Sequence, residues 1–81
     1  MPNPNKGITN PKRTGQWLTM VLNDHKTLEH ELAKILDVSE QRVINWAKGE
    51  RGMRLYMVMA ICYIFELDED PKKIYQFLKE P

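Results

Sequence analysis

Apolar residues recur at helical spacing along most of the chain, which predicts a protein built from helices. The first such stretch runs from Gly15 to about Asp24. Its apolar residues fall on one helical face and are Trp17, Leu18, Val21 and Leu22. A second stretch starts after Thr27, the expected N-cap, and has Glu29 in its first turn, where the helix dipole favours an acid. Its apolar stripe consists of Leu28, Leu32, Ile35 and Leu36.

The sequence "LAKILDVSEQRVINWAKGER" interrupts this spacing once, at residues 37–39, and then resumes it. Asp37 tolerates the left-handed backbone that a tight helix exit requires, and Ser39 is the expected N-cap of the next helix. Gly49 follows that helix as a C-terminal glycine would. At 100° per residue, Val43 and Trp46 lie on the inner face. The polar residues on its outer face are Gln41, Asn45 and Lys48.

Two more helices are expected after the loop "GERGM". The first runs from about Arg54 to Phe65, and the second starts at Pro71 with Asp70 as its N-cap. The expected buried stripe of the first comprises Leu55, Val58, Met59, Cys62 and Phe65, with Ile61 beside it. We find no strand signal and no internal repeat. The pattern therefore predicts an all-α domain of five helices over residues 15–81.

The helix expected at residues 54–65 is apolar almost all round, which indicates burial on both of its sides. Its second face carries Tyr56, Met57, Ala60, Tyr63 and Ile64. The last helix also holds more apolar groups than one face needs. We expect a homodimer whose interface contains Tyr56, Tyr63, Ile64, Tyr75 and Phe77. The alternative is a monomer in which the C-terminal helix or the N-terminal arm folds back over this face.

Residues 1–14, "MPNPNKGITNPKRT", are rich in proline and asparagine and predict a flexible, basic arm. The net charge of the whole chain is only +1. Its distribution is uneven, because the first 27 residues carry four cations and one acid, whereas residues 66–81 carry three lysines and five acids. A basic N-terminal third and an acidic C-terminal end indicate an anionic partner on one side.

Composition argues against several classes of function. The chain shows no pairing of nucleophile and base, no glycine-rich phosphate loop and no metal-ligand cluster, so we expect no enzyme, no cofactor, no metal and no small-molecule ligand. The single cysteine, Cys62, is expected to be a buried apolar residue, and His25 and His30 to be solvated. No apolar run reaches the length of a membrane span, and the first residues lack a signal-peptide pattern, so we expect a cytoplasmic protein.

The two helices around residues 37–39 resemble the helix-turn-helix of the phage repressor and Cro family, also called the lambda-repressor-like or XRE family. The resemblance runs without a gap through "ELAKILDVSEQRVINWAKGER" and covers roughly residues 15–70. Ala33 is the small residue that two steeply crossing helices need where their backbones approach. Glu29 departs from the family, where a glutamine often contacts phosphate, and Met53 replaces a common proline.

The resemblance implies that the helix of residues 39–48 enters the major groove of double-stranded DNA. Gln41 and Asn45 carry amides that can pair bidentately with adenine. The expected base-contacting residues are Glu40, Gln41, Arg42, Ile44 and Asn45. The expected phosphate contacts are Ser39, Lys48, Arg51 and Arg54, with Lys12 and Arg13 of the arm.

The leading hypothesis is therefore a DNA-binding transcriptional regulator, a small repressor of the phage or mobile-element type. An activator that binds next to polymerase is equally compatible with the sequence. The alternative from another class is a protein-interaction module, an adaptor or inhibitor that keeps the fold without binding DNA. The near-neutral net charge, the acids Glu29 and Glu40, and the apolar helix expected at residues 54–65 favour that alternative.

Overall fold

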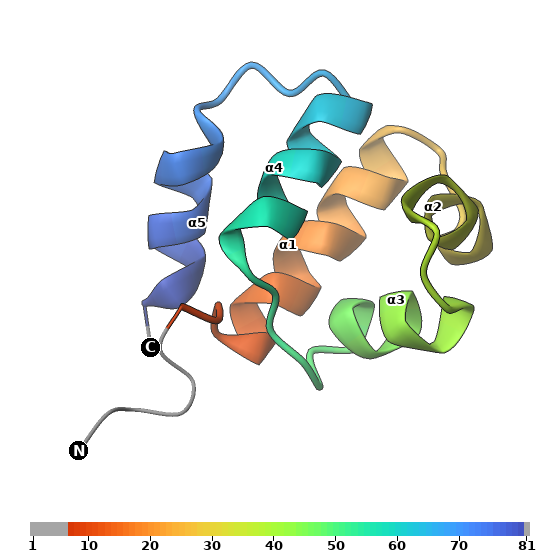
Figure 1. Cartoon of the computed structure of the whole chain (residues 1–81), viewed down its shortest axis with the longest axis horizontal. Coiled ribbons are helices and arrows are strands. Elements are labelled where there is room, and N and C mark those ends of the chain that lie inside the picture. The colour runs from red at the N-terminus through yellow and green to blue at the C-terminus, as the bar shows by residue number, and fades with distance from the viewer. Residues whose placement is uncertain (1–6, 81) are drawn as a thin grey trace.

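The computed structural model describes residues 7–80 of the chain, which form five helices (Figure 1). The helices are α1 (Pro11–Asp24), α2 (Glu29–Leu36), α3 (Glu40–Ala47), α4 (Leu55–Ile64) and α5 (Pro71–Lys79). Within these residues the only extended pairing is an isolated antiparallel bridge between Ile8 and Arg54, so the fold is all-α. α1 contacts α3 on one side and α5 on the other, α2 packs on α3, and α4 packs on α5.

The first helix starts earlier than the apolar pattern predicted. It begins at Pro11, and the side chain of Asn10 accepts hydrogen bonds from the backbone N–H groups of Lys12 and Arg13. Asparagine at the N-cap followed by proline at the first helical position is a favoured start, because proline lacks an N–H group that would need a partner there. The predicted boundary between a flexible arm and a domain at residue 15 is therefore wrong.

The segment before α1 is tied to the rest of the chain rather than free. The backbone N–H of Thr9 donates to the carbonyl oxygen of Met53 at 3.0 Å, and the Thr9 hydroxyl accepts from the Met53 N–H at 2.9 Å. The Tyr75 hydroxyl donates to the carbonyl oxygen of Gly7 at 2.6 Å. The domain therefore includes the segment from Gly7 onward, and the remainder of the predicted arm, residues 1–6, lies outside the described residues.

α2 and α3 are joined by three residues, as the interrupted pattern predicted. Asp37 ends α2 in the left-handed conformation, with φ 57° and ψ 45°. The Ser39 hydroxyl caps α3 by accepting the N–H of Arg42 at 3.2 Å. The expected cap of α2 is wrong, because the Thr27 hydroxyl donates to the carbonyl of His25. Leu28 takes the N-cap position of α2 instead.

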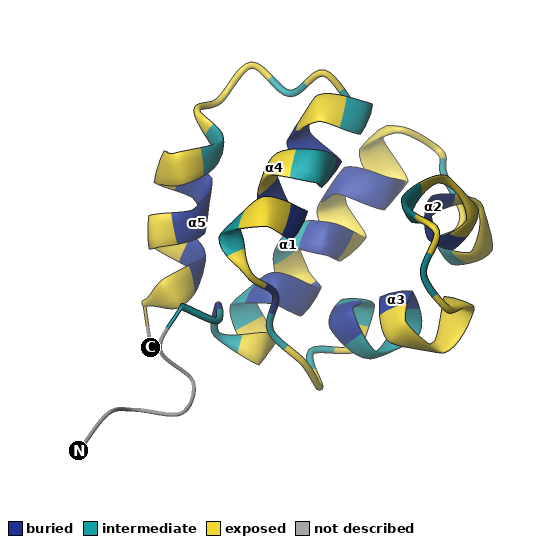
Figure 2. Ribbon diagram, viewed as in Figure 1, coloured by how far each residue is buried: buried dark blue, intermediate teal, exposed yellow. Residues whose placement is uncertain are grey.

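The core lies among all five helices, and each contributes buried side chains (Figure 2). Leu18, Leu32, Val43, Ile61 and Leu78 are fully buried. Two expected core residues of the second apolar stripe are on the surface instead, since Leu28 is 59% and Ile35 is 58% exposed. α2 has only two turns and buries one short face, which Leu32 and Ala33 fill.

α4 is rotated relative to the predicted stripe. Met57, expected on the second face, is buried, whereas Met59, expected in the core, is 45% exposed. Val58, Ile61 and Cys62 are buried as predicted. Because α4 is apolar on nearly every side, its sequence alone did not determine which side faces inward. None of the helices within residues 7–80 has the length and apolar character needed to cross a membrane.

Candidate nucleic-acid interface

The outer face of α3 presents a pair of amide side chains. The amide nitrogen of Gln41 donates to the side-chain oxygen of Asn45 at 2.9 Å, one helical turn apart. Gln41 is exposed and Asn45 is half-buried, so both remain at the surface. Their hydrogen bond holds the two side chains together while leaving the Gln41 oxygen and the Asn45 nitrogen to face other groups. α3 itself runs along one edge of the molecule (Figure 1).

The same surface of α3 includes the other residues predicted to contact bases. Glu40 is the first helical residue and is exposed, and Ile44 is half-buried between the ends of this surface. Arg42 is exposed, and its guanidinium lies 5.4 Å from the centre of the Trp46 ring. This cation–π contact orients Arg42 toward the start of α4 rather than toward the amide pair.

Three arginines line one shallow cavity of about 160 Å³ between α3 and the start of α4. They are Arg42, Arg51 and Arg54, and all three are exposed. The sequence pattern started this helix at about Arg54, but in the structure Arg54 is the N-cap that precedes α4. Because the N-terminal end of a helix carries partial positive charge, the cavity combines that charge with three guanidinium groups. It is suited to a phosphate oxygen.

The start of α1 lies directly against the end of α3. A methyl group placed on Gly49, which follows α3, would lie 3.4 Å from the Cα atom of Lys12. The Thr19 hydroxyl of α1 donates to the carbonyl oxygen of Ala47, at 3.3 Å. Lys12 and Lys48 are both exposed, so two lysines from distant parts of the sequence extend the positive surface beside α3.

Two predicted phosphate ligands make contacts within the protein. Arg13 places its guanidinium 4.6 Å from the centre of the Phe77 ring and donates to the carbonyl oxygen of the same residue at 3.5 Å. The structure therefore brings Arg13 to α5 and not to the surface formed with Lys12 and Lys48. Ser39 accepts a backbone N–H as the cap of α3, and its hydroxyl proton remains available to an acceptor.

Two residues that position this surface, Gly15 and Gly52, were missed by the sequence interpretation. Gly15 lets α1 approach the end of α3, since a methyl group there would lie 2.7 Å from the Gly49 nitrogen and 2.9 Å from the Ala47 oxygen. Gly52 lets the loop before α4 meet the segment before α1, because a methyl group would lie 1.9 Å from the Thr9 oxygen. Asn10 and Pro11 are a helix-start signal that would have placed Gly15 inside the first helix, and a glycine inside a helix often marks a close contact.

The apolar residues expected to form a dimer interface do not lie on one surface. Tyr56 and Tyr63 are 59% and 85% exposed on α4. Tyr75, by contrast, is buried inside the chain, so its expected place at an exposed interface is wrong. Phe77 is exposed but lies with Arg13 on the side of α5 toward α1. Ile64 is half-buried.

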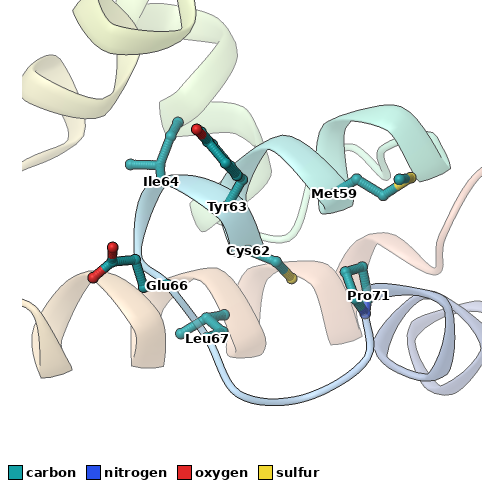
Figure 3. A pocket seen from close by; sticks show the side chains of 7 residues that line it. All are labelled: Met59, Cys62, Tyr63, Ile64, Glu66, Leu67 and Pro71. Carbon is teal, nitrogen blue, oxygen red and sulfur yellow. The ribbon is translucent and has the colours of Figure 1, made fainter.

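The exposed side of α4 is apolar and adjoins a surface cavity. Met59, Tyr63 and Ile64 of α4 line a surface cavity of about 600 Å³ together with residues of the following loop (Figure 3). Tyr56, Met59 and Tyr63 follow one another at helical spacing along the exposed side of α4, and the small side chain of Ala60 lies between them. We call these four residues the α4 surface.

Cys62 and His25 make contacts within the protein, whereas His30 is exposed as predicted. Cys62 is buried, and its burial, followed by the negative charge of Glu69, raises the pKa of its thiol. The ring of His25 packs against Phe65 with centroids 4.6 Å apart, and its Nδ1 atom lies 2.9 Å from the carbonyl oxygen of Val21. Within residues 7–80, no group of three histidine, cysteine or acidic side chains could hold a metal ion.

Comparison with known proteins gives no relative for this chain. No family model, no curated protein and no solved structure matches it.

Proposed function

We propose that this chain is a sequence-specific DNA-binding regulator of the phage repressor and Cro type, which inserts α3 into the major groove. The observation that carries this proposal is the paired amides of Gln41 and Asn45 on the exposed face of a helix that follows a three-residue turn. Asparagine and glutamine are the side chains that pair bidentately with adenine. Ile44 lies beside them, where it can contact a thymine methyl group.

The cations beside α3 supply the phosphate contacts in this proposal. Lys12 and Lys48 lie on one side, where α1 meets the end of α3, and Arg51 and Arg54 line the cavity at the start of α4. Phosphate contacts set the register of a protein on the duplex, while base contacts supply the specificity. Arg42 belongs with the second group of cations, because it shares that cavity.

The regulator acts as a homodimer that pairs through the α4 surface. A two-fold axis near Ala60 would bring Tyr56 of one copy against Tyr63 of the other, since a two-fold interface uses the same patch on both copies. The small side chain of Ala60 lets the two helices approach. Such a dimer would place two copies of α3 about one DNA turn apart on a near-palindromic site. Repression follows if that site overlaps a promoter.

A protein-interaction module on the same fold is the second candidate function. The observation that favours it is the same α4 surface, because Met59 and the two tyrosines would suit a different protein equally well. Salt dependence separates the two functions. Each phosphate that a protein neutralises makes log affinity for duplex DNA fall with log salt by a slope of about −0.9. A protein-interaction module would show no such binding.

The test is the affinity of the full chain for mixed-sequence duplex DNA, measured by fluorescence anisotropy over a range of salt concentrations. With one phosphate contact from each of these five cations per copy, we expect a slope of about −4.5 for each copy bound. Arg54→Ala should reduce this slope by about 0.9 per copy, because it removes one contact. Lys72→Ala, on the exposed side of α5, removes the same charge away from α3 and should leave the slope unchanged. Absence of DNA binding at low salt would refute the proposal.

A further inference from the structure

A second surface, on the side of α1 that faces away from α3, combines an apolar floor with an acidic rim. It is a groove of about 820 Å³ between α1 and α5, closed at one end by the loop that joins α4 to α5. Gly15 and Thr19 contact the end of α3, whereas Trp17, Met20 and Asp24 lie on the opposite side of α1 and line this groove. The groove is therefore separate from the proposed DNA surface.

The floor of the groove exposes large apolar side chains. Met20 is 53% and Phe77 is 58% exposed. Trp17 is half-buried and packs against the core. Surface apolar residues of this size, gathered in one hollow, mark an interaction site more often than isolated ones do.

The rim of the groove is strongly negative. Four acids line it, Asp24, Asp68, Glu69 and Asp70, against Lys73 as the one lysine or arginine among its lining residues. Asp24 lies in the last turn of α1, where an acid opposes the helix dipole and costs folding free energy. A positively charged partner would offset that cost.

We propose that this groove binds a basic amphipathic segment of another protein, with apolar side chains on the floor and lysine or arginine along the rim. The lining residues of both walls span two helical turns, from Trp17 to Asp24 on α1 and from Asp70 to Phe77 on α5. Two turns correspond to about 10 Å of helix, which is long enough to hold a short peptide segment.

The negative charge of the rim argues against DNA, an anionic lipid surface or a second copy of this chain as the occupant of the groove. Duplex DNA and anionic lipid surfaces would be repelled by the four carboxylates. A second copy docked symmetrically would bring its own Asp24, Asp68, Glu69 and Asp70 against the same acids. Because the groove lies across α1 from α3, its occupant is expected to bind together with DNA. The inference does not depend on the proposed function, since it uses none of the α3 residues.

The test uses the full chain labelled with ¹⁵N and two short helical model peptides, one of leucine and lysine and the other of leucine and glutamate in the same order. Chemical-shift changes locate the bound peptide, and titration gives its affinity. We expect the lysine peptide to shift amides of α1, the α4–α5 loop and α5, with affinity falling as salt is added. The glutamate peptide should not bind.

Two pairs of variants test the rim and the floor separately. Asp68→Asn with Glu69→Gln should weaken binding of the lysine peptide by about 3- to 10-fold, since each lost surface ion pair contributes about 0.2–1 kcal/mol. Glu50→Gln with Glu80→Gln makes the same charge change outside the groove and should have no effect.

Met20→Gln should weaken binding several-fold because it removes apolar contact from the floor. Ile35→Gln, at an apolar residue of similar exposure on α2, is its control. Shifts confined to α4, equal binding of both peptides, or no binding at all would overturn the inference. Shifts of the groove amides on simple dilution would overturn it too, because they would identify a second copy as the occupant.

Discussion

Replacing Gly15 by alanine tests whether α1 and α3 meet as closely as the structure indicates. On helix propensity alone, the substitution should stabilise the chain by about 0.5–1 kcal/mol, since glycine is unfavourable inside a helix. The added methyl group would lie 2.7 Å from the Gly49 nitrogen, 2.8 Å from its Cα atom and 2.9 Å from the Ala47 oxygen. All three are backbone atoms, so no side-chain rotation can relieve the contact.

Ordinary contact begins near 3.4 Å, so the two segments must separate by about 0.7 Å. Overpacking of this kind costs about 1–3 kcal/mol, which exceeds the gain in helix propensity. We expect Gly15→Ala to lower the free energy of unfolding by about 1–2 kcal/mol in urea denaturation followed by circular dichroism. Gln16→Ala, at the exposed neighbouring position, controls for helix propensity. A Gly15→Ala variant more stable than the wild type would refute the close approach.

Three further substitutions test the core and its attachments. Trp46→Ala should cost about 3–5 kcal/mol and unfold much of the protein, because the ring is 2% exposed and its Nε1–H donates to the Gly52 oxygen at 3.1 Å; a well-folded variant with weakened DNA binding would contradict this. Tyr75→Phe should cost about 0.5–1.5 kcal/mol and speed amide hydrogen exchange in the segment before α1; unchanged exchange would show that the hydroxyl does not hold this segment. The raised pKa of the Cys62 thiol keeps it protonated in the folded chain at pH values above its ordinary pKa of about 8.5. The unfolded chain loses this proton in the same pH range, so the free energy of unfolding falls as pH rises. Cys62→Ala should make that fall shallower in denaturation at pH 8 to 10, and an identical pH dependence would refute the assignment.

The helices and most of their core residues follow from the sequence. Leu18, Leu22, Leu32, Val43 and Trp46 were predicted to face inward from their spacing, and all five are buried. The N-caps of α3 and α5 also follow from local residues, because the side chains of Ser39 and Asp70 accept free N–H groups in the first turn of the helix that follows. Local rules suffice where one short segment supplies both partners.

The remaining features depend on contacts between distant segments. The rotation of α4 depends on its packing against α5, and so the choice between Met57 and Met59 as a buried residue could not be made from an all-apolar helix. Tyr75 was expected at an interface because nothing local shows that its hydroxyl meets Gly7. Arg13 was expected to contact phosphate, and its partner in the structure, Phe77, could not be foreseen because it lies 64 residues away in the sequence.

The central claim is that α3 recognises a DNA sequence, and selection from a random pool of duplex DNA tests it most directly. The purified chain and the double variant Gln41→Ala, Asn45→Ala are taken through the same selection at about 0.1 M salt, where exposed charges are screened beyond about 10 Å. The proposal predicts that the wild type alone enriches a short motif, arranged as an inverted repeat, while each single variant loses about 1–3 kcal/mol of discrimination at one base pair. The claim would be contradicted if neither protein enriched a motif, or if both enriched the same one.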